Sequence, residues 1–232
     1  MFKRIIKIIL TIVSALLFTL VLSSTVSSDS ESFEYYFHRN NENKISLTFD
    51  DGPHPINTPK ILNLLDKYNV KATFFIIGQN AVNYKDTLIK IVERGHEIGN
   101  HTFSHEVIRN KSAPQIVDEV EKCRRVIYDV CGENTVVFRP PGGLMAQLDS
   151  SDAEILEGYD IIQWSIDTMD WAHNTPEEIC KYVLNEIQSG DIILMHDYIG
   201  YDSPTPEALE LLIPALLEKG YEFVTVSELL AS

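Results

Sequence analysis

The chain has 232 residues, of which 44% are hydrophobic and 23% are charged, a balance that argues against disorder and allows one core or two small domains. Its formal net charge of −15 argues against nucleic acid as a partner, because an acidic surface repels a phosphate backbone. Three cysteines, Cys123, Cys131 and Cys180, are too few for a disulfide scaffold, and the sequence leaves open whether any two are bridged.

Residues 1–28 have the order of an export signal. Basic residues come first, an uncharged apolar run follows at 8–22, and small polar residues end the segment. We therefore expect an exported protein, secreted or anchored at the cell surface. Residues 1–28 are expected to be either a cleaved signal peptide or an N-terminal membrane anchor with a tether at 5–26. Residues 29–43 are interpreted as a linker or entry segment.

From residue 44 onward, short β-rich runs alternate with longer helical patterns. We expect strands at 45–49, 72–77, 97–99, 135–139, 161–166, 192–196 and 221–226. We expect helices at 58–68, 80–94, 113–130, 152–158, 176–189 and 205–219. Such alternation indicates an α/β fold of about seven parallel strands wrapped by helices, either an open doubly wound sheet or a partly closed (β/α) barrel. Residues 44–232 are expected to form one domain.

Polar clusters follow several of the predicted strands at their carboxyl ends, where β/α domains collect functional groups. The first strand ends in Asp50 and Asp51, two adjacent carboxylates. The later clusters are NHTFSH at 100–105, RPPGG at 139–143, DTMDW at 167–171 and HD at 196–197. We therefore expect one functional site at this edge of the sheet.

The spacing of two histidines indicates a metal site. His101 and His105 stand four residues apart, which on one helical turn would place both rings on one face. A carboxylate from another strand end would complete a three-ligand site with a position open for water. If either Asp50 or Asp51 binds the metal, the other can take a proton from that water. Arg139 is the candidate to hold the free carboxylate in a two-bond fork.

His196 ends an apolar run that should be a buried strand. It is either a core histidine or the proton donor to a leaving group. A carboxylate should hold the ring protonated and oriented, and Asp167, Asp170 and Asp197 are all available. His96 is expected to be a structural hydrogen-bonding residue and not a ligand.

Five short segments occur in a fixed order along the chain: TFDDGP at 48–53, HTFSH at 101–105, RPPGG at 139–143, DTMDW at 167–171 and LMH at 194–196. They resemble the five motifs of the polysaccharide deacetylases of carbohydrate esterase family 4. The resemblance implies a distorted (β/α) barrel that removes N- or O-linked acetyl groups from sugars. Our leading hypothesis is a deacetylase of an N-acetylglucosamine polymer or oligosaccharide, peptidoglycan or chitin-type. The resemblance also implies one divalent metal ion, with zinc expected and cobalt, nickel or manganese able to serve.

Carried over residue by residue, the resemblance assigns the chemistry. The metal ligands would be Asp51, His101 and His105. Asp50 would be the general base and Arg139 would orient it. His196 would be the general acid, and Asp170 would tether it.

The resemblance also implies a substrate wall and an oxyanion donor. Trp171 and Leu194 look like the apolar wall around the acetyl methyl group. Many family members carry Tyr after the two prolines and direct its backbone N–H at the oxyanion, whereas this chain has Gly142. Gly142 still has a backbone N–H that can donate, but any contact between a tyrosine ring and the sugar is missing.

Two other functions stay open at this point. An O-acetyl esterase acting on acetylated xylan shares the same catalytic parts. A non-catalytic carbohydrate-binding homologue is the alternative from another functional class, although all the catalytic positions are filled. The sequence predicts neither the polymer nor the oligomeric state.

Overall fold

The computed structural model describes residues 34–35, 42–108, 111–143, 156, 158–172, 174–200 and 202–232. These residues belong to one compact unit. The predicted signal or anchor at 1–28, and most of the helix expected at 152–158, lie outside the described residues. No helix of the described part of the chain is both long and apolar enough to cross a membrane.

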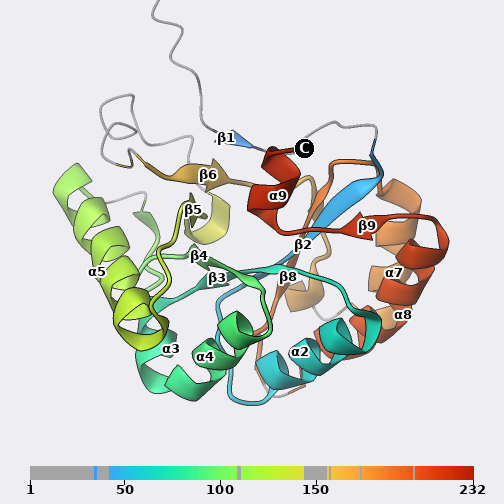
Figure 1. Cartoon of the computed structure of the whole chain (residues 1–232), viewed down its shortest axis with the longest axis horizontal. Helices are drawn as coiled ribbons and strands as arrows, with labels where there is room; N and C mark the ends of the chain where they lie inside the picture. The colour runs from blue at the N-terminus through green and yellow to red at the C-terminus, as the bar shows by residue number, and fades with distance from the viewer. Residues whose placement is uncertain are drawn as a thin grey trace, which may run out of the picture. The chain divides into compact units, whose positions relative to one another are not determined.

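The strands pair in parallel and curl into a half-barrel with helices packed around it (Figure 1). The seven main strands are β2 (Lys44–Asp50), β3 (Thr73–Ile76), β4 (Glu97–Asn100), β5 (Val137–Phe138), β6 (Asp160–Ile162), β7 (Ile166–Asp167) and β8 (Ile192–His196). Their order in space is β6-β5-β4-β3-β2-β8-β7. Two short strands, β1 (Glu34–Tyr35) and β9 (Glu222–Phe223), pair with β6 and β2. The predicted (β/α) barrel is therefore confirmed over an open doubly wound sheet.

The single strand predicted at 161–166 is wrong, because this stretch forms two strands at opposite ends of the strand order. β6 pairs with β5, and β7 pairs with β8. Between them, the Ser165 hydroxyl donates to Asp191 Oδ1 at 2.8 Å and the Ser165 N–H donates to Ile192 O at 3.0 Å. The chain must give up its pairing with β5 before it can pair with β8, so the strand is interrupted between β6 and β7. These two short strands lie at the two ends of the half-barrel.

The helices come between the strands in chain order. They are α2 (Asn57–Tyr68), α3 (Gly78–Asn83), α4 (Lys85–Glu93), α5 (Ala113–Cys131), α7 (Pro176–Glu186), α8 (Thr205–Glu218) and α9 (Val226–Leu230), with 3-10 turns η2 (Pro141–Gly143) and η4 (Asp170–Ala172). The helix predicted at 80–94 is two helices, because Tyr84 has non-helical dihedral angles (φ −127°, ψ 47°). The start of α7 is a capping box in which Thr175 Oγ1 accepts a hydrogen bond from Glu178 N.

Two predicted strands are shorter than expected. Within 135–139 only β5 pairs, and within 221–226 only β9 pairs. The second run ends early because Thr225 Oγ1 accepts a hydrogen bond from Glu228 N at 3.3 Å, which starts α9. The segment predicted as a linker at 29–43 contains β1.

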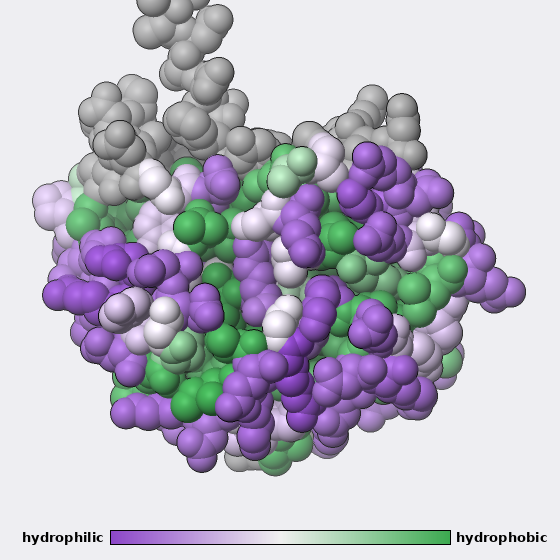
Figure 2. Space-filling model, in the orientation of Figure 1, coloured by the Kyte–Doolittle hydropathy of each residue, from purple (hydrophilic) through white to green (hydrophobic). Residues whose placement is uncertain are grey.

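Each helix buries one stripe of side chains. In α2 that stripe includes Ile61, Leu62 and Leu65, all fully buried. On the face drawn in Figure 2, hydrophilic residues cover most of the surface and hydrophobic ones form smaller patches between them. The amphipathic helices therefore shield the sheet while keeping an acidic, polar exterior.

Alternation along β2 and β8 decides which side chains enter the barrel. The side chains that pack under the helices are Ile45, Leu47, Phe49, Ile193 and Met195. Because successive side chains on a strand point to opposite faces, Thr48 and Asp50 on β2 and Leu194 and His196 on β8 face inward. The register pairs Asp50 with His196 at the carboxyl ends of these neighbouring strands.

Helix α9 closes the opposite end of the barrel. Its residues Val226 and Leu229 pack with a second core cluster drawn from the barrel interior: Phe75, Val137, Ile162, Ile192 and Val224. The Val226 N–H donates to Thr73 Oγ1 at 2.9 Å, at the amino end of β3. This plug leaves the carboxyl end as the mouth of the barrel, where the polar clusters lie.

Candidate active site

Three side chains at the mouth converge on one point. Asp51 Oδ1 lies 3.0 Å from His105 Nε2 and 3.4 Å from His101 Nε2, and the three groups form a cluster able to hold a metal ion. Two ligands that are each about 2.0–2.1 Å from a tetrahedral ion lie roughly 3.4 Å apart, so the spacing fits a zinc-sized ion. Apart from these two histidines, Asp51 Oδ1 has no partner among the described residues, which leaves it available as a ligand.

The electrostatics of the cluster favour an ionised ligand. Burial raises the pKa of Asp51, but the two histidines outweigh burial and hold that pKa well below its usual range. His101 is 1% exposed and its Nδ1 lies 2.6 Å from Arg139 O. Because a carbonyl only accepts, Nδ1–H must donate, and Nε2 keeps its lone pair for a metal.

The helical turn predicted for the two histidines is wrong, although the rings do meet, with centroids 5.0 Å apart. The segment is a loop in which Thr102 (φ 67°) and His105 (φ 58°) have left-handed backbones. Asn100 Oδ1 accepts the Thr102 N–H at 2.9 Å, and Thr102 Oγ1 accepts the His105 N–H at 3.2 Å. These side-chain bonds hold a shape that sterics alone disfavour.

Asp50 is held from inside the barrel. The Nη1 group of Arg139, which is fully buried, donates to Asp50 Oδ1 at 2.7 Å and to Thr48 Oγ1 at 2.8 Å. Arg139 follows β5, so it reaches β2 across the interior. The predicted two-bond fork is wrong, because Nε donates to Ile162 O at 3.3 Å and Nη2 donates to Gln163 O at 3.1 Å. One charge-assisted bond therefore orients the carboxylate.

His196 is held by Asp170. The ring Nδ1 lies 2.8 Å from Asp170 Oδ1, and Asp170 Oδ2 accepts the His196 N–H at 2.8 Å and the Thr205 hydroxyl at 2.7 Å. Burial lowers the pKa of His196, but Asp170, with Asp50 and Asp51, outweighs burial and raises that pKa to about 9. The ring is therefore protonated near neutral pH, with Nε2 free to donate a proton.

The structure chooses among the three carboxylates predicted as tethers. Asp167 Oδ1 instead accepts the Met169 N–H at 2.8 Å within a turn. Asp197 accepts the hydroxyl of Thr58. Asp170 alone of the three bonds the His196 ring, which agrees with the role that the resemblance assigns to it.

Three other predicted residues lie around the mouth with their roles untested. Gly142 is exposed, with φ 68°, and the neighbouring Gly143 N–H is already donated to Pro140 O at 2.9 Å. Trp171 is 53% exposed, whereas Leu194 is 3% exposed on the inward face of β8. Their assignments as oxyanion donor and methyl wall stay predictions.

Several residues that support the site carry little or no signal in the sequence. Thr48 was signalled only by its alternation with Asp50, and nothing local marked Thr205, which reaches Asp170 from the start of α8. The guanidinium carbon of Arg139 lies 4.1 Å from the ring centroid of Phe75. His96 was expected to form hydrogen bonds, yet it is buried and neither ring nitrogen has a partner among the described residues.

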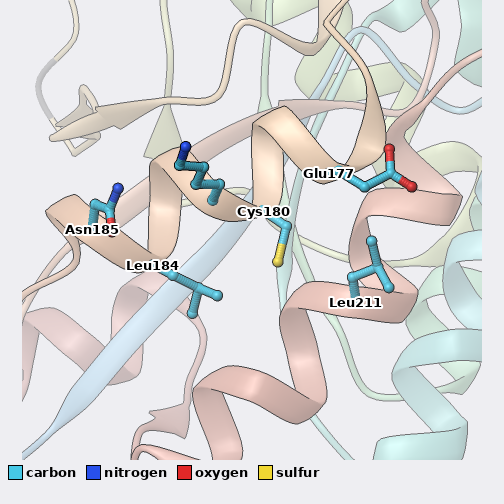
Figure 3. A pocket seen from close by; sticks show the side chains of 6 residues that line it. Glu177, Cys180, Leu184, Asn185 and Leu211 are labelled. Carbon is cyan, nitrogen blue, oxygen red and sulfur yellow. The ribbon is translucent and has the colours of Figure 1, made fainter.

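A separate groove of about 460 Å³ lies between α7 and α8 (Figure 3). Its lining residues are Glu177, Cys180, Lys181, Leu184, Asn185 and Leu211. None of the predicted site residues belongs to it. The convergence at the mouth of the barrel is therefore the candidate active site.

Comparison with known proteins agrees with the geometry. Residues 38–158 match the profile of a family described as "Polysaccharide deacetylase". A peptidoglycan-N-acetylglucosamine deacetylase from Bacillus cereus is 39% identical over 193 residues, which cover 82% of this chain and 90% of the relative. A peptidoglycan-N-acetylglucosamine deacetylase from Listeria monocytogenes is 34% identical over 80% of this chain, which spans only 38% of that relative.

Two solved structures are similar to this chain in fold and in sequence. A family 4 acetyl xylan esterase from Clostridium thermocellum in complex with a cobalt ion has a TM-score of 0.72 and 37% identity, and covers 81% of this chain and 90% of its own. A CE4 family pseudoenzyme from Bacillus anthracis has a TM-score of 0.78 and 31% identity, and covers 85% of this chain and 68% of its own.

Proposed function

Because the chain belongs to the polysaccharide deacetylase family, carbohydrate esterase family 4, we propose that it hydrolyses acetyl groups from an N-acetylglucosamine-containing polysaccharide. Peptidoglycan is the first candidate polymer, since the Bacillus cereus relative is a peptidoglycan-N-acetylglucosamine deacetylase. A chitin-type polymer is the second. The observation that carries the proposal is the convergence of Asp51, His101 and His105 beside a base held by an arginine and an acid held by a carboxylate.

A divalent ion completes this site. Asp51, His101 and His105 would hold it, and zinc is the ion we expect, with cobalt, nickel or manganese as substitutes. The cobalt ion in the solved acetyl xylan esterase supports a site of broad selectivity. When bound, such an ion polarises an acetyl carbonyl and lowers the pKa of water.

Asp50 acts as the general base. Asp50 is 4% exposed and Arg139 orients its carboxylate, so the second oxygen is left to take a proton from the attacking water. That oxygen, Oδ2, lies 3.7 Å from His101 Nε2, which places it beside the metal ligands. The water oxygen forms a bond to the acetyl carbon as the proton moves to Asp50.

His196 acts as the general acid. Asp170 holds Nδ1, so Nε2 carries the proton that the departing sugar nitrogen receives as the carbon–nitrogen bond breaks. The products are acetate and a free amine. A backbone N–H at Gly142 is proposed to stabilise the oxyanion, a donor typically worth about 10²- to 10³-fold in rate. Trp171 and Leu194 are proposed to border the acetyl methyl group.

A second function has an observation in its favour. The acetyl xylan esterase from Clostridium thermocellum shares 37% identity with this chain, so an O-acetyl ester of xylan is the alternative substrate. The pseudoenzyme from Bacillus anthracis makes a non-catalytic carbohydrate-binding homologue the third. In this chain every acid, base and ligand position is filled, which argues against the third.

Acetate release across a substrate panel tests the proposal. The purified protein is offered peptidoglycan, N-acetylglucosamine oligomers and acetylated xylan, with and without a chelator and with zinc or cobalt restored. We expect release from the first two, loss with chelator and recovery with metal. Release from xylan alone would favour the esterase, and no release from any substrate by a metal-loaded protein would refute catalysis.

Export is a further part of the proposal. The signal-like segment at 1–28 supports a secreted or surface-anchored protein whose substrate lies outside the membrane. Fractionation of cells that express the full chain, with the mass of the mature protein, tests it. A full-length protein in the soluble interior fraction would refute export.

A further inference from the structure

The turn that carries a metal ligand has a strained backbone. Asp51 follows β2 with φ 76°, a left-handed conformation that a non-glycine residue adopts at a cost. Such a conformation persists only where its surroundings hold it. The contacts around the turn therefore decide where the Asp51 carboxylate points relative to His101 and His105.

Asp197, the residue directly after β8, bonds to the chain on both sides of this turn. Its N–H donates to Asp50 O at 3.2 Å, just before the turn. Its carboxylate accepts the hydroxyl of Thr58, and the same hydroxyl oxygen accepts the His54 N–H at 2.7 Å, just after the turn. Asp197 is fully buried, so these bonds are shielded from water.

The middle of the turn lies directly against the same carboxylate. A Cβ atom added to Gly52 would lie 2.3 Å from both carboxylate oxygens of Asp197, far inside van der Waals contact. Gly52 has no left-handed φ angle, so the close approach of Asp197, and not the backbone angle, requires a glycine here. Asp197 Oδ1 has no hydrogen-bond partner among the described residues.

The opposite side of the turn is held by α3 and by the residue that precedes it. The Asn80 side chain donates to Asp51 O at 2.7 Å, and the Ile77 N–H donates to Gly52 O at 3.0 Å. Hydrogen bonds therefore hold the turn from two opposite sides. Asp197 holds the turn on the β8 side.

We propose that Asp197 is a positioning residue whose carboxylate fixes the turn after β2 and thereby aims Asp51 at the metal. The inference rests on the proposed metal site. It concerns metal affinity as well as catalysis, because a ligand that is wrongly aimed binds less tightly. Asp197 follows His196 directly, so the same segment of chain supplies the acid and supports the ligand.

Zinc affinity of the metal-free protein is the readout, measured by competition with a chromophoric chelator. We expect Asp197→Ala to weaken zinc binding about 10- to 100-fold, the range found for outer contacts of metal ligands. Asp197→Asn keeps the volume and an acceptor for Thr58, so it should restore most of the affinity. The matched control is Asp191→Ala, a buried carboxylate at the other end of β8 that bonds Ser165 and should leave zinc affinity unchanged.

A pair of substitutions tests the close approach itself. Gly52→Ala should weaken zinc binding in the wild-type background, because its methyl group collides with Asp197. In the Asp197→Ala background the same change should cost little, since the space is then open. Equal losses in both backgrounds would overturn the proposal.

The outcomes separate this inference from the proposed function. If the wild-type protein binds no zinc, the metal site and the inference both fail. If it binds zinc and a folded Asp197→Ala protein binds it equally well, only the inference fails. Should Asp197→Ala not fold, a folded Gly52→Ala protein with wild-type zinc affinity overturns the inference in its place.

Discussion

Replacing Asp170 with asparagine removes the charge that tethers His196. Asp170 is 1% exposed, and its two oxygens accept the ring Nδ1–H, the His196 N–H and the Thr205 hydroxyl. Asparagine has nearly the same volume and keeps one acceptor oxygen. The substitution therefore tests charge and orientation more than packing.

The expected loss of rate in Asp170→Asn follows from the pKa of His196. Burial lowers that pKa, and Asp170 is foremost among the carboxylates that outweigh burial and raise it to about 9. Without the Asp170 charge the pKa should fall to about 6.5 or below, so the protonated fraction at about pH 7.5 drops from nearly all to about one-tenth. Loss of the acid proton alone then lowers the rate about tenfold, and a misoriented ring lowers it further.

The assay is kcat/KM for acetate release between about pH 6 and pH 10. In the wild-type protein the alkaline limb of this pH profile should lie somewhat below about 9, because a bound cation offsets part of the carboxylate charge that raises the pKa of His196. In Asp170→Asn the limb should move to lower pH. The control is Thr205→Val, which removes one hydrogen bond to Asp170 and keeps its charge, so its limb should stay in place. If the alkaline limb of the pH profile is unchanged in Asp170→Asn, Asp170 does not raise the pKa of His196 and the assignment is refuted.

Three further predictions concern the base, its arginine and a buried histidine. Asp50→Asn should lower acetate release at least about 100-fold while zinc binding persists, and an undiminished rate would exclude Asp50 as the base. Arg139→Met leaves the Asp50 carboxylate buried without its partner, and urea unfolding should show a loss of about 3–5 kcal/mol; a loss below about 1 kcal/mol would contradict the ion pair. Burial lowers the pKa of His96 to about 4. Below about pH 6.5 His96 is therefore protonated in the unfolded chain but stays neutral in the folded protein. The free energy of unfolding should fall as pH falls, by about 2 kcal/mol between about pH 7 and pH 5. His96→Leu should flatten that slope in urea unfolding, and an unaltered slope would assign the pH dependence to other groups.

The motifs predicted the chemistry because each combines a reactive residue type with a position at the carboxyl end of a strand. Asp50, Asp51 and His196 come at strand ends, and parallel strands bring their carboxyl ends to one edge. The alternation of Thr48 and Asp50 with apolar neighbours in β2 likewise indicates which side chains enter the barrel. These are local properties of the chain, so they can be read without coordinates.

The split of one predicted strand into β6 and β7 lies beyond local reading. From 162 to 166 apolar and polar residues alternate without a glycine or proline, as in a single strand, so nothing in the pattern marks the break. Closure of the half-barrel decides it, since the first part pairs with β5 and the second with β8. The helical spacing expected for His101 and His105 failed for a related reason, because left-handed residues in the loop bring the rings together instead.

By itself the amino-acid sequence determined an α/β fold of parallel strands and, through its five motifs, the family, and it predicted the ligand, base and acid residues, because residue type and strand-end position are properties of the chain. Only the tertiary structure showed that Asp170 holds both the ring and the backbone N–H of His196, that a single bond joins Arg139 to Asp50, and that Asp197 lies against Gly52. The physical reason is that a hydrogen bond acts over about 3 Å. Partners far apart in sequence are therefore chosen by how whole elements pack, which no local pattern specifies.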